Sequence, residues 1–186
     1  MRLLGIDPGF AALGLATVEL LPVGERVVQL QVLRTQPSTT KRHIRKADDN
    51  SDRAREFARL LHQAITPDVV ALCVEATALP FGRCRSSVVS NLGRIRGVLD
   101  ALAEVHGLPI IEETAQTLKL LATGDRTATK EVVQECLGAR FPGVEALWPT
   151  QKTLVEHAGD ALAAVLAGLQ SDVVRAARRA GGMAHG

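Results

Sequence analysis

The first twenty residues constrain the fold more than any other stretch of the chain. An apolar run ends at Asp7, the dipeptide Pro8-Gly9 follows at once, and a second apolar run covers residues 11–20. Apolar runs of this length bounded by turn residues predict buried strands, here joined as a hairpin. Asp7 therefore stands at the carboxyl end of a strand. From this stretch alone, a turn cap is the simpler interpretation of Asp7, and a metal ligand is the alternative.

A second acid occupies the same kind of position. Residues 69–74 are six consecutive apolar residues, which is typical of a strand buried on both faces, and Glu75 ends the run. Two such acids are harder to explain as unrelated turn caps. Ligands of open α/β sheets bind beside the carboxyl ends of the strands, so Asp7 and Glu75 form one candidate site if their strands are neighbours.

A third candidate acid lies near the end of the chain. Thr153 and Glu156 match a capping box, which predicts the start of a helix. His157 and Asp160 are three residues apart and therefore project from one face of that helix. A histidine on a helix is more often a packing or surface residue than a ligand, whereas Asp160 stands among small residues that indicate a closely packed face.

Periodicity and turn residues predict the remaining elements. We expect a strand over 26–35, a loop over 36–51, a helix over 52–65 capped by Ser51, and a helix over 86–105 packed closely on the sheet through Gly93 and Gly97. Further along, we expect a strand over 108–111, helices over 115–122 and from Thr127 or Thr129 to Arg140, and a helix over 154–169. Together these elements predict one α/β domain over 1–170, followed by a basic, Gly-ending, frayed tail over 171–186.

The composition excludes several classes of protein. A hydrophobic fraction of 46% and a charged fraction of 23% suit a soluble globular chain. We find no apolar stretch long enough for a membrane span and no secretory signal pattern, so no membrane association is expected. The three cysteines are odd in number and widely spaced, which favours a reducing compartment, and we expect a cytoplasmic protein.

Basic residues gather in two stretches, although the formal net charge is only +2. One stretch runs over residues 41–46. The other lies between Glu75 and Asp100, where four arginines occur and no acid does. Such clusters suit a polyanionic partner, and a solvated surface is the alternative interpretation.

Taken in order, the motifs resemble those of the RuvC family of Holliday-junction resolvases, a branch of the ribonuclease-H-like fold. Residues 5–9 match the first motif, Val74-Glu75 matches the second acid, residues 92–98 resemble the helix after it, and residues 157–163 match the last motif, which begins with Asp or His. The resemblance spans most of residues 2–170. It implies a mixed five-stranded sheet flanked by helices, and a RuvC-like nuclease domain over 1–170.

The resemblance also implies an active site. Asp7, Glu75, His157 and Asp160 would be the catalytic residues and would hold two Mg²⁺ ions, for which Mn²⁺ can substitute. Residues 116–119 and 129–130 resemble segments that bring lysines near the scissile phosphate. On this basis Lys130 is a further catalytic residue, and Lys119 contacts DNA.

The resemblance implies partners as well. It predicts a homodimer that resolves four-way DNA junctions by paired cuts, with the helix over 86–105 as the dimer surface and a branch-migration helicase as a further partner. Phe81 is the nearest aromatic residue to the base-stacking aromatic of the family. The residues expected to contact DNA are Lys41, Arg42, Arg45, Lys46, Phe81, Arg83, Arg85, Arg94 and Lys119.

Three alternatives stay open at this point. The first is a less selective nuclease of the same superfamily that cuts branched DNA or RNA/DNA hybrids. The second is an actin-like ATPase or sugar kinase, whose phosphate-binding hairpin resembles the Asp-x-Gly turn, although such chains are about twice as long. The third is a DNA-binding protein of the same fold without catalysis.

Overall fold

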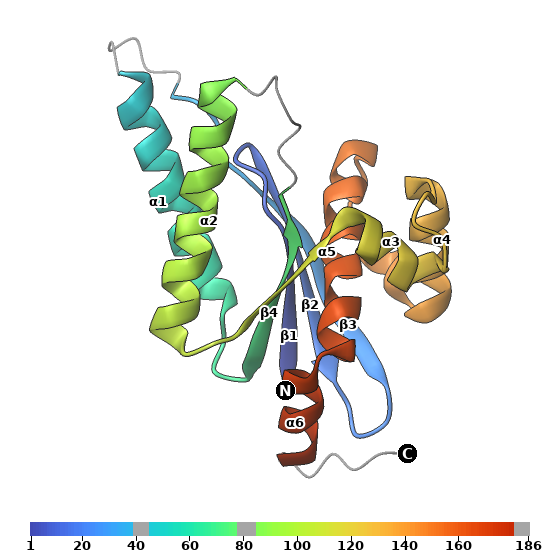
Figure 1. Cartoon of the computed structure of the whole chain (residues 1–186). Helices are drawn as coiled ribbons and strands as arrows, with labels where there is room; N and C mark the ends of the chain where they lie inside the picture. Colours follow the sequence, from blue (N-terminus) through green and yellow to red (C-terminus); the bar gives the residue numbers. More distant parts are fainter. Residues whose placement is uncertain (39–44, 78–84, 181–186) are drawn as a thin grey trace.

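A computed structural model describes residues 1–38, 45–77 and 85–180, and Figure 1 shows the arrangement of their elements. Their order is β1 Arg2–Asp7, β2 Ala12–Leu20, β3 Glu25–Arg34, α1 Lys46–Ala64, β4 Val69–Ala76, α2 Ser86–His106, β5 Ile110–Thr114, α3 Ala115–Thr123, α4 Lys130–Arg140, the 3-10 helix η1 Val144–Leu147, α5 Lys152–Gln170 and α6 Asp172–Ala180.

The strands form one mixed five-stranded sheet in the order β3-β2-β1-β4-β5. β1 pairs antiparallel with β2 and parallel with β4, and β4 pairs parallel with β5. The register places Ile6 opposite Val74, so the residues that follow, Asp7 and Glu75, stand beside each other at the same edge of the sheet. This confirms the predicted sheet and the predicted neighbourhood of the two acids.

The alternation of side chains along β1 and β4 separates two cores. Leu4 and Ile6 pack with Leu72 and Val74 beneath α1 and α2, which cover one face of the sheet (Figure 1). The intervening positions face α5 on the other side, where α3 and α4 add a further layer. Successive side chains of a strand point to opposite faces, so Asp7 and Glu75 both lie on the α5 face.

Glycines in the sheet let α5 approach it at backbone contact. A Cβ atom added at Gly5 would lie 2.1 Å from the Ala161 carbonyl oxygen, and one added at Gly14 would lie 2.0 Å from the His157 carbonyl oxygen. Any larger side chain at either position would push the helix away. The first turns of α5 therefore lie directly over the carboxyl end of β1.

The predicted role of two other glycines is wrong. A Cβ atom added at Gly93 or Gly97 would meet nothing within 4 Å, so neither glycine brings α2 close to the sheet. α2 packs on the sheet through larger residues, Ile95 and Leu99. Small residues at helical spacing indicated a packed face, but the sequence did not show which face points inward.

Two predicted helix starts also differ from the structure. α1 begins at Lys46 and not at residue 52, and Ser51 lies inside the helix, where its hydroxyl donates to the Ala47 carbonyl oxygen instead of capping. Asp48 and Asp49 occupy the first turn, where negative charge favours a helix start. α5 begins at Lys152 without a side-chain cap, so the predicted capping box does not form.

The prediction of a frayed tail is wrong for residues 172–180, which form α6. Val174 is only 1% exposed and belongs to the core beneath α5. Arg178 Nη2 donates to Glu25 Oε1 at 2.6 Å, which joins α6 to the start of β3. Residues 181–186 lie outside the described residues. Elsewhere, β5 begins at Ile110, two residues later than expected.

Across the described residues, the structure contains no helix with the length and apolar character that a bilayer crossing needs. Cys73 is a buried free thiol, and Cys136 is a free thiol of intermediate exposure.

Candidate active site

Four predicted site residues come together where β1, β4 and α5 meet. Asp7 ends β1, Glu75 is the penultimate residue of β4, and His157 and Asp160 lie in the first turns of α5. The parallel pairing of β1 with β4 and the close approach of α5 position all four. We call Asp7, Glu75, Asp160, His157 and Lys130 the active-site cluster.

Two contacts organise this cluster. His157 Nδ1 donates a hydrogen bond to Asp7 Oδ2 at 2.6 Å. The Lys130 ammonium, carried by the first residue of α4, lies 3.3 Å from Asp160 Oδ2 and 3.0 Å from Glu156 Oε2. Two of the acidic ligand candidates, Asp7 and Asp160, are therefore already in contact with a basic side chain.

The carboxylates of the cluster repel one another. The pKa of Glu75 is raised from 4.5 to about 7, first because the carboxyl is buried and second because Asp160 and Asp7 carry like charge. Burial also raises the pKa of Asp160, and the charge of Asp7 adds to this effect. The charges of the three carboxylates therefore act on one another.

The acids of the cluster also change the pKa values of its two basic groups, His157 and Lys130. The hydrogen bond to Asp7 raises the pKa of His157. Burial lowers the pKa of Lys130, but its contacts with Glu156 and Asp160 outweigh burial and leave this pKa above its ordinary value. The acids of the cluster thus stabilise the protonated, positively charged forms of His157 and Lys130.

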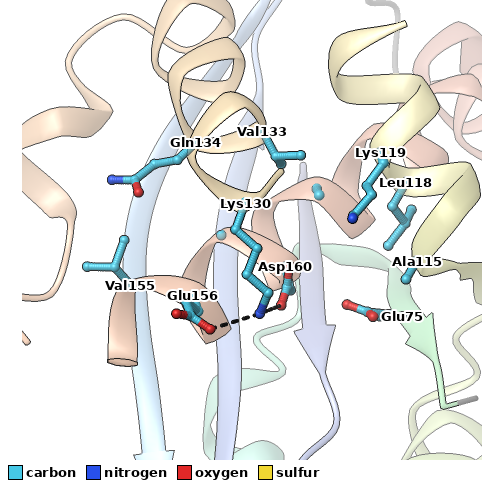
Figure 2. Close-up of a pocket in the computed structure, with 12 residues that line it drawn as sticks. Glu75, Ala115, Leu118, Lys119, Lys130, Val133, Gln134, Val155, Glu156 and Asp160 are labelled. Atoms are coloured by element: carbon cyan, nitrogen blue, oxygen red, sulfur yellow. Dashed lines mark hydrogen bonds and ion pairs between the residues drawn. The ribbon is translucent and has the colours of Figure 1, made fainter. Parts of the chain in front are cut away.

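A hollow between α3, α4 and α5 opens beside the cluster (Figure 2). Glu75, Asp160 and Glu156 point their carboxylates toward it, and Lys119 and Lys130 point their ammonium groups toward it. Apolar side chains form its walls: Leu118, Val133, Val155, Ala115 and Ala163. The arrangement suits a ligand that brings phosphate oxygens to the lysines and positive charge to the carboxylates.

The donor set suits a divalent cation such as Mg²⁺. Carboxylate oxygens are the ligands that Mg²⁺ prefers, and repelling carboxylates gain most from a cation placed between them. Within residues 1–38, 45–77 and 85–180, however, no three His, Cys, Asp or Glu side chains are arranged closely enough to hold a metal ion. The contacts of Lys130 with Asp160 and of His157 with Asp7 occupy oxygens that such an ion would need. The residues fit the ion chemically, and binding requires these contacts to rearrange.

The residues predicted to contact DNA occupy several places. Arg45 and Arg85 are exposed at the starts of α1 and α2, and Lys46 is exposed in the first turn of α1. Arg94 is half-buried between these helices, where its Nη1 donates to Ser51 Oγ at 3.1 Å. Lys119 lines the hollow. Four others, Lys41, Arg42, Phe81 and Arg83, lie outside the described residues.

Glu156 has a role in this region that the sequence did not indicate. Its spacing from Thr153 predicts half of a capping box, but its carboxylate pairs with Lys130. Its spacing was the available signal, because residues four apart share a helix face and Glu156 stands four residues before Asp160. The lysine that joins them comes from another helix, which the spacing alone does not reveal.

A mixed sheet in this strand order, with carboxylates at the ends of its first and fourth strands and on the helix across them, defines a ribonuclease-H-like nuclease domain. The family model described as "Crossover junction endodeoxyribonuclease RuvC" matches residues 3–168. The chain belongs to this RuvC family of crossover junction endodeoxyribonucleases, metal-dependent enzymes that resolve Holliday junctions in recombination and repair.

Relatives of known name agree with this assignment. The chain is 29% identical over 180 residues to the crossover junction endodeoxyribonuclease RuvC of Gloeobacter violaceus, with 97% of this chain and 94% of that protein covered. It is 32% identical over 179 residues to the one of Clavibacter michiganensis subsp. michiganensis, with 95% and 80% covered.

Solved structures support the fold. The structure described as T. thermophilus RuvC in complex with Holliday junction substrate matches with a TM-score of 0.69 and 21% identity, and covers 90% of this chain and 92% of that one. A second Thermus thermophilus RuvC structure matches with a TM-score of 0.64 and 22% identity over 98% of both chains. These matches confirm the predicted ribonuclease-H-like architecture.

Proposed function

We propose that the chain cuts four-way DNA junctions by phosphodiester hydrolysis that depends on two Mg²⁺ ions held by Asp7, Glu75, His157 and Asp160. The main support is the Glu75 carboxyl, whose burial and whose like-charged neighbours Asp160 and Asp7 together raise its pKa to about 7. Side chains that repel one another in this way need an external cation to be stable as carboxylates at neutral pH.

The chemistry divides between the ions and the chain. When bound, the two ions supply an activated water and stabilise the leaving 3′ oxygen, which yields a 5′-phosphate and a 3′-hydroxyl. Lys130 and Lys119 bind the scissile phosphate from the α3 and α4 side of the hollow. Fixed contacts on both sides of the phosphate hold the reacting atoms in line and reduce the entropy lost on reaction.

His157 has a positioning part in this scheme. Its Nδ1 donates to Asp7 Oδ2 at 2.6 Å, which restrains the orientation of that carboxylate. A neutral imidazole is needed for a ligand role, and the tautomer that donates through Nδ1–H leaves Nε2 unprotonated and available as a ligand.

We also infer a homodimer, because a junction with two-fold symmetry requires two symmetric cuts. α2 is the proposed dimer surface, and Val88 and Val89 in its first turn are exposed apolar residues that suit a partner. A helicase partner follows from the family resemblance alone. Sedimentation at micromolar concentration, with and without junction DNA, tests the dimer, and a monomer under both conditions would contradict it.

The decisive experiment is cleavage of a synthetic mobile four-way junction by the Asp7→Asn variant. We expect cleavage in Mg²⁺ to fall by roughly a thousandfold or more, because loss of a metal ligand would raise the reaction barrier by about 4 kcal/mol. Junction binding measured in Ca²⁺ should be unchanged. Asp172→Asn on α6 is the matched control, since Asp172 is exposed and pairs only with Arg175 among the contacts described.

The same assay tests the substrate. A resolvase should cut the four-way junction in preference to a Y-fork, a flap or an RNA/DNA hybrid. Equal cutting of all four substrates would favour the less selective nuclease. Near-normal cleavage by Asp7→Asn would remove the proposed mechanism altogether.

A further inference from the structure

Glu156 is an acid of the hollow that the proposed ligand set does not use. It lies on α5 one turn before Asp160, and its side chain is 44% exposed. Its carboxylate oxygen Oε2 is 3.0 Å from the Lys130 ammonium, slightly closer than Asp160 Oδ2 at 3.3 Å. Lys130 therefore bridges two carboxylates on the same face of α5, as the dashed lines in Figure 2 show.

The two carboxylates of this bridge differ in their surroundings. Asp160 and Glu75 both line the hollow, and Asp160 lies on the Glu75 side of the Lys130 ammonium in Figure 2. Glu156 stands on the opposite side of the Lys130 ammonium from Glu75, as Figure 2 shows. Glu156 thus holds the lysine from the side opposite to the proposed metal ligands.

Binding of a cation at Asp160 would disturb this bridge. Like charges repel at short range, so a divalent ion on Asp160 weakens the attraction between that carboxylate and the Lys130 ammonium. Lysine has a long, flexible side chain that loses rotamer freedom when it is held in place. With Asp160 as its sole anionic partner, the ammonium would move into solvent as the ion bound.

We propose that Glu156 is a positioning residue that keeps the Lys130 ammonium beside the active-site cluster when a cation takes Asp160. The metal-dependent half of this inference rests on the proposed function. In it, Lys130 exchanges Asp160 for a phosphate oxygen of the substrate while its contact with Glu156 persists. Glu156 itself touches neither the metal nor the substrate.

Competitive labelling of lysines with an amine-reactive ester tests the inference without any cleavage reaction. The labelling rate of Lys130 is measured by mass spectrometry relative to Lys46, which is exposed at the start of α1 in the same chain. The wild type is compared with Glu156→Gln. The control is Glu131→Gln, which removes the same charge from the residue next to Lys130. Each protein is measured without metal and with Mg²⁺ alone.

The expected result has two parts. Without metal, Glu156→Gln should label about two- to five-fold faster at Lys130 than the wild type, the change expected for loss of a partly exposed ion pair. Mg²⁺ should raise the Lys130 rate further in Glu156→Gln and leave it low in the wild type. Glu156→Asp keeps the negative charge and should restore most of the protection.

Two results would overturn the inference. One is equal labelling of Lys130 in Glu156→Gln and Glu131→Gln. The other is a wild-type chain in which Mg²⁺ exposes Lys130 as fully as the Glu156→Gln substitution does.

Junction cleavage provides the second readout. Glu156→Gln should lower kcat with KM little changed, because the lysine acts on bound substrate, and Glu156→Asp should recover most of kcat. An equal loss in Glu156→Asp would contradict a role for the charge. The proposed function fails separately, when the wild type does not cut a junction in Mg²⁺, and the labelling result obtained without metal does not depend on that.

Discussion

Two groups of charged residues lie near the two ends of α5, and they differ in how far basic side chains of the chain balance their acids. The active-site cluster, near the start of the helix, brings together three carboxylates, of which Asp160 pairs with Lys130. The second group, which we call the Glu25 cluster, consists of Glu25, Arg140 and Arg178 and lies near the end of the helix. There, one carboxylate that is only 8% exposed accepts hydrogen bonds from two guanidinium groups.

The difference separates charge that holds elements of the fold together from charge at the candidate active site. The Glu25 cluster joins β3, α4 and α6, and the chain itself supplies all the positive charge that the buried acid needs. In the active-site cluster the chain leaves negative charge in excess, and burial together with this excess raises the pKa of Glu75. An excess of this kind destabilises the protein alone and is relieved by a cation from outside, which is what a metal-dependent nuclease requires.

The largest effect on stability is expected at the Glu25 cluster. Glu25→Gln removes the anion from between two guanidinium groups, and we expect a loss of about 3 kcal/mol in the free energy of unfolding, at the lower end for a buried pair because Arg140 is 53% exposed. Urea unfolding measures it, and junction cleavage by the folded protein should be unchanged.

Glu19→Gln is the matched control for that variant. Glu19 pairs with Arg26 on the neighbouring strand, but Arg26 is 67% exposed, so the loss should stay below about 1 kcal/mol. Equal effects of the two substitutions would show that the Glu25 cluster is no more structural than an ordinary surface pair.

In the active-site cluster, Glu75→Gln is expected to change the free energy of unfolding by a smaller amount and to increase it. The folded pKa of Glu75, about 7, lies above its ordinary value of 4.5, so the folded chain holds this proton more tightly than the unfolded chain does. Stability is therefore lost as the pH rises from 4.5 through 7. Without metal, Glu75→Gln should be more stable than the wild type by about 2 kcal/mol at pH 8, a figure reduced for partial exposure, and equally stable at pH 4.

Adding Mg²⁺ sharpens this test. Thermal unfolding at pH 8 should show the wild type gaining stability from Mg²⁺ and Glu75→Gln gaining less, because the variant has lost a proposed ligand. A wild-type chain that is already the more stable of the two without metal would mean that its carboxylates do not repel as described.

The smallest effect is expected at Arg140. Its side chain is half exposed and is one of two cations on Glu25, so Arg140→Met should lower the free energy of unfolding by less than about 1 kcal/mol. Arg178→Met should lower it more, since Arg178 is 23% exposed. The reverse order, measured by urea unfolding, would mean that α4 and not α6 depends on the Glu25 cluster.

Much of the site was predictable because its positions follow from local patterns. Apolar runs ending at Asp7 and Glu75 indicated two buried strands, and the pairing of β1 with β4 confirmed that these acids are neighbours. The spacing of His157 and Asp160 placed them on one helix face. The ligand roles of these residues stay predictions, and so do the roles in DNA binding.

Other predictions failed where a local pattern had more than one structural outcome. Thr153 and Glu156 have the spacing of a capping box, yet Glu156 pairs with Lys130, 26 residues earlier in the chain. Gly93 and Gly97 resemble a packing face, but the close contacts with α5 occur at Gly5 and Gly14. Residues 172–180 have no long apolar stripe, and Val174 together with Arg178 was enough to dock them.

The amino-acid sequence alone specified the strands, most of the helices and the alternation that puts Asp7 and Glu75 on one face of the sheet, because these depend on neighbours a few residues apart. Only the folded chain shows that Lys130 bridges Glu156 and Asp160, and that Glu25 binds arginines 115 and 153 residues away. Contacts of this kind depend on how closely α5 packs against the sheet and on which side chains then face each other. Local sequence propensities do not determine which of these distant side chains come into contact.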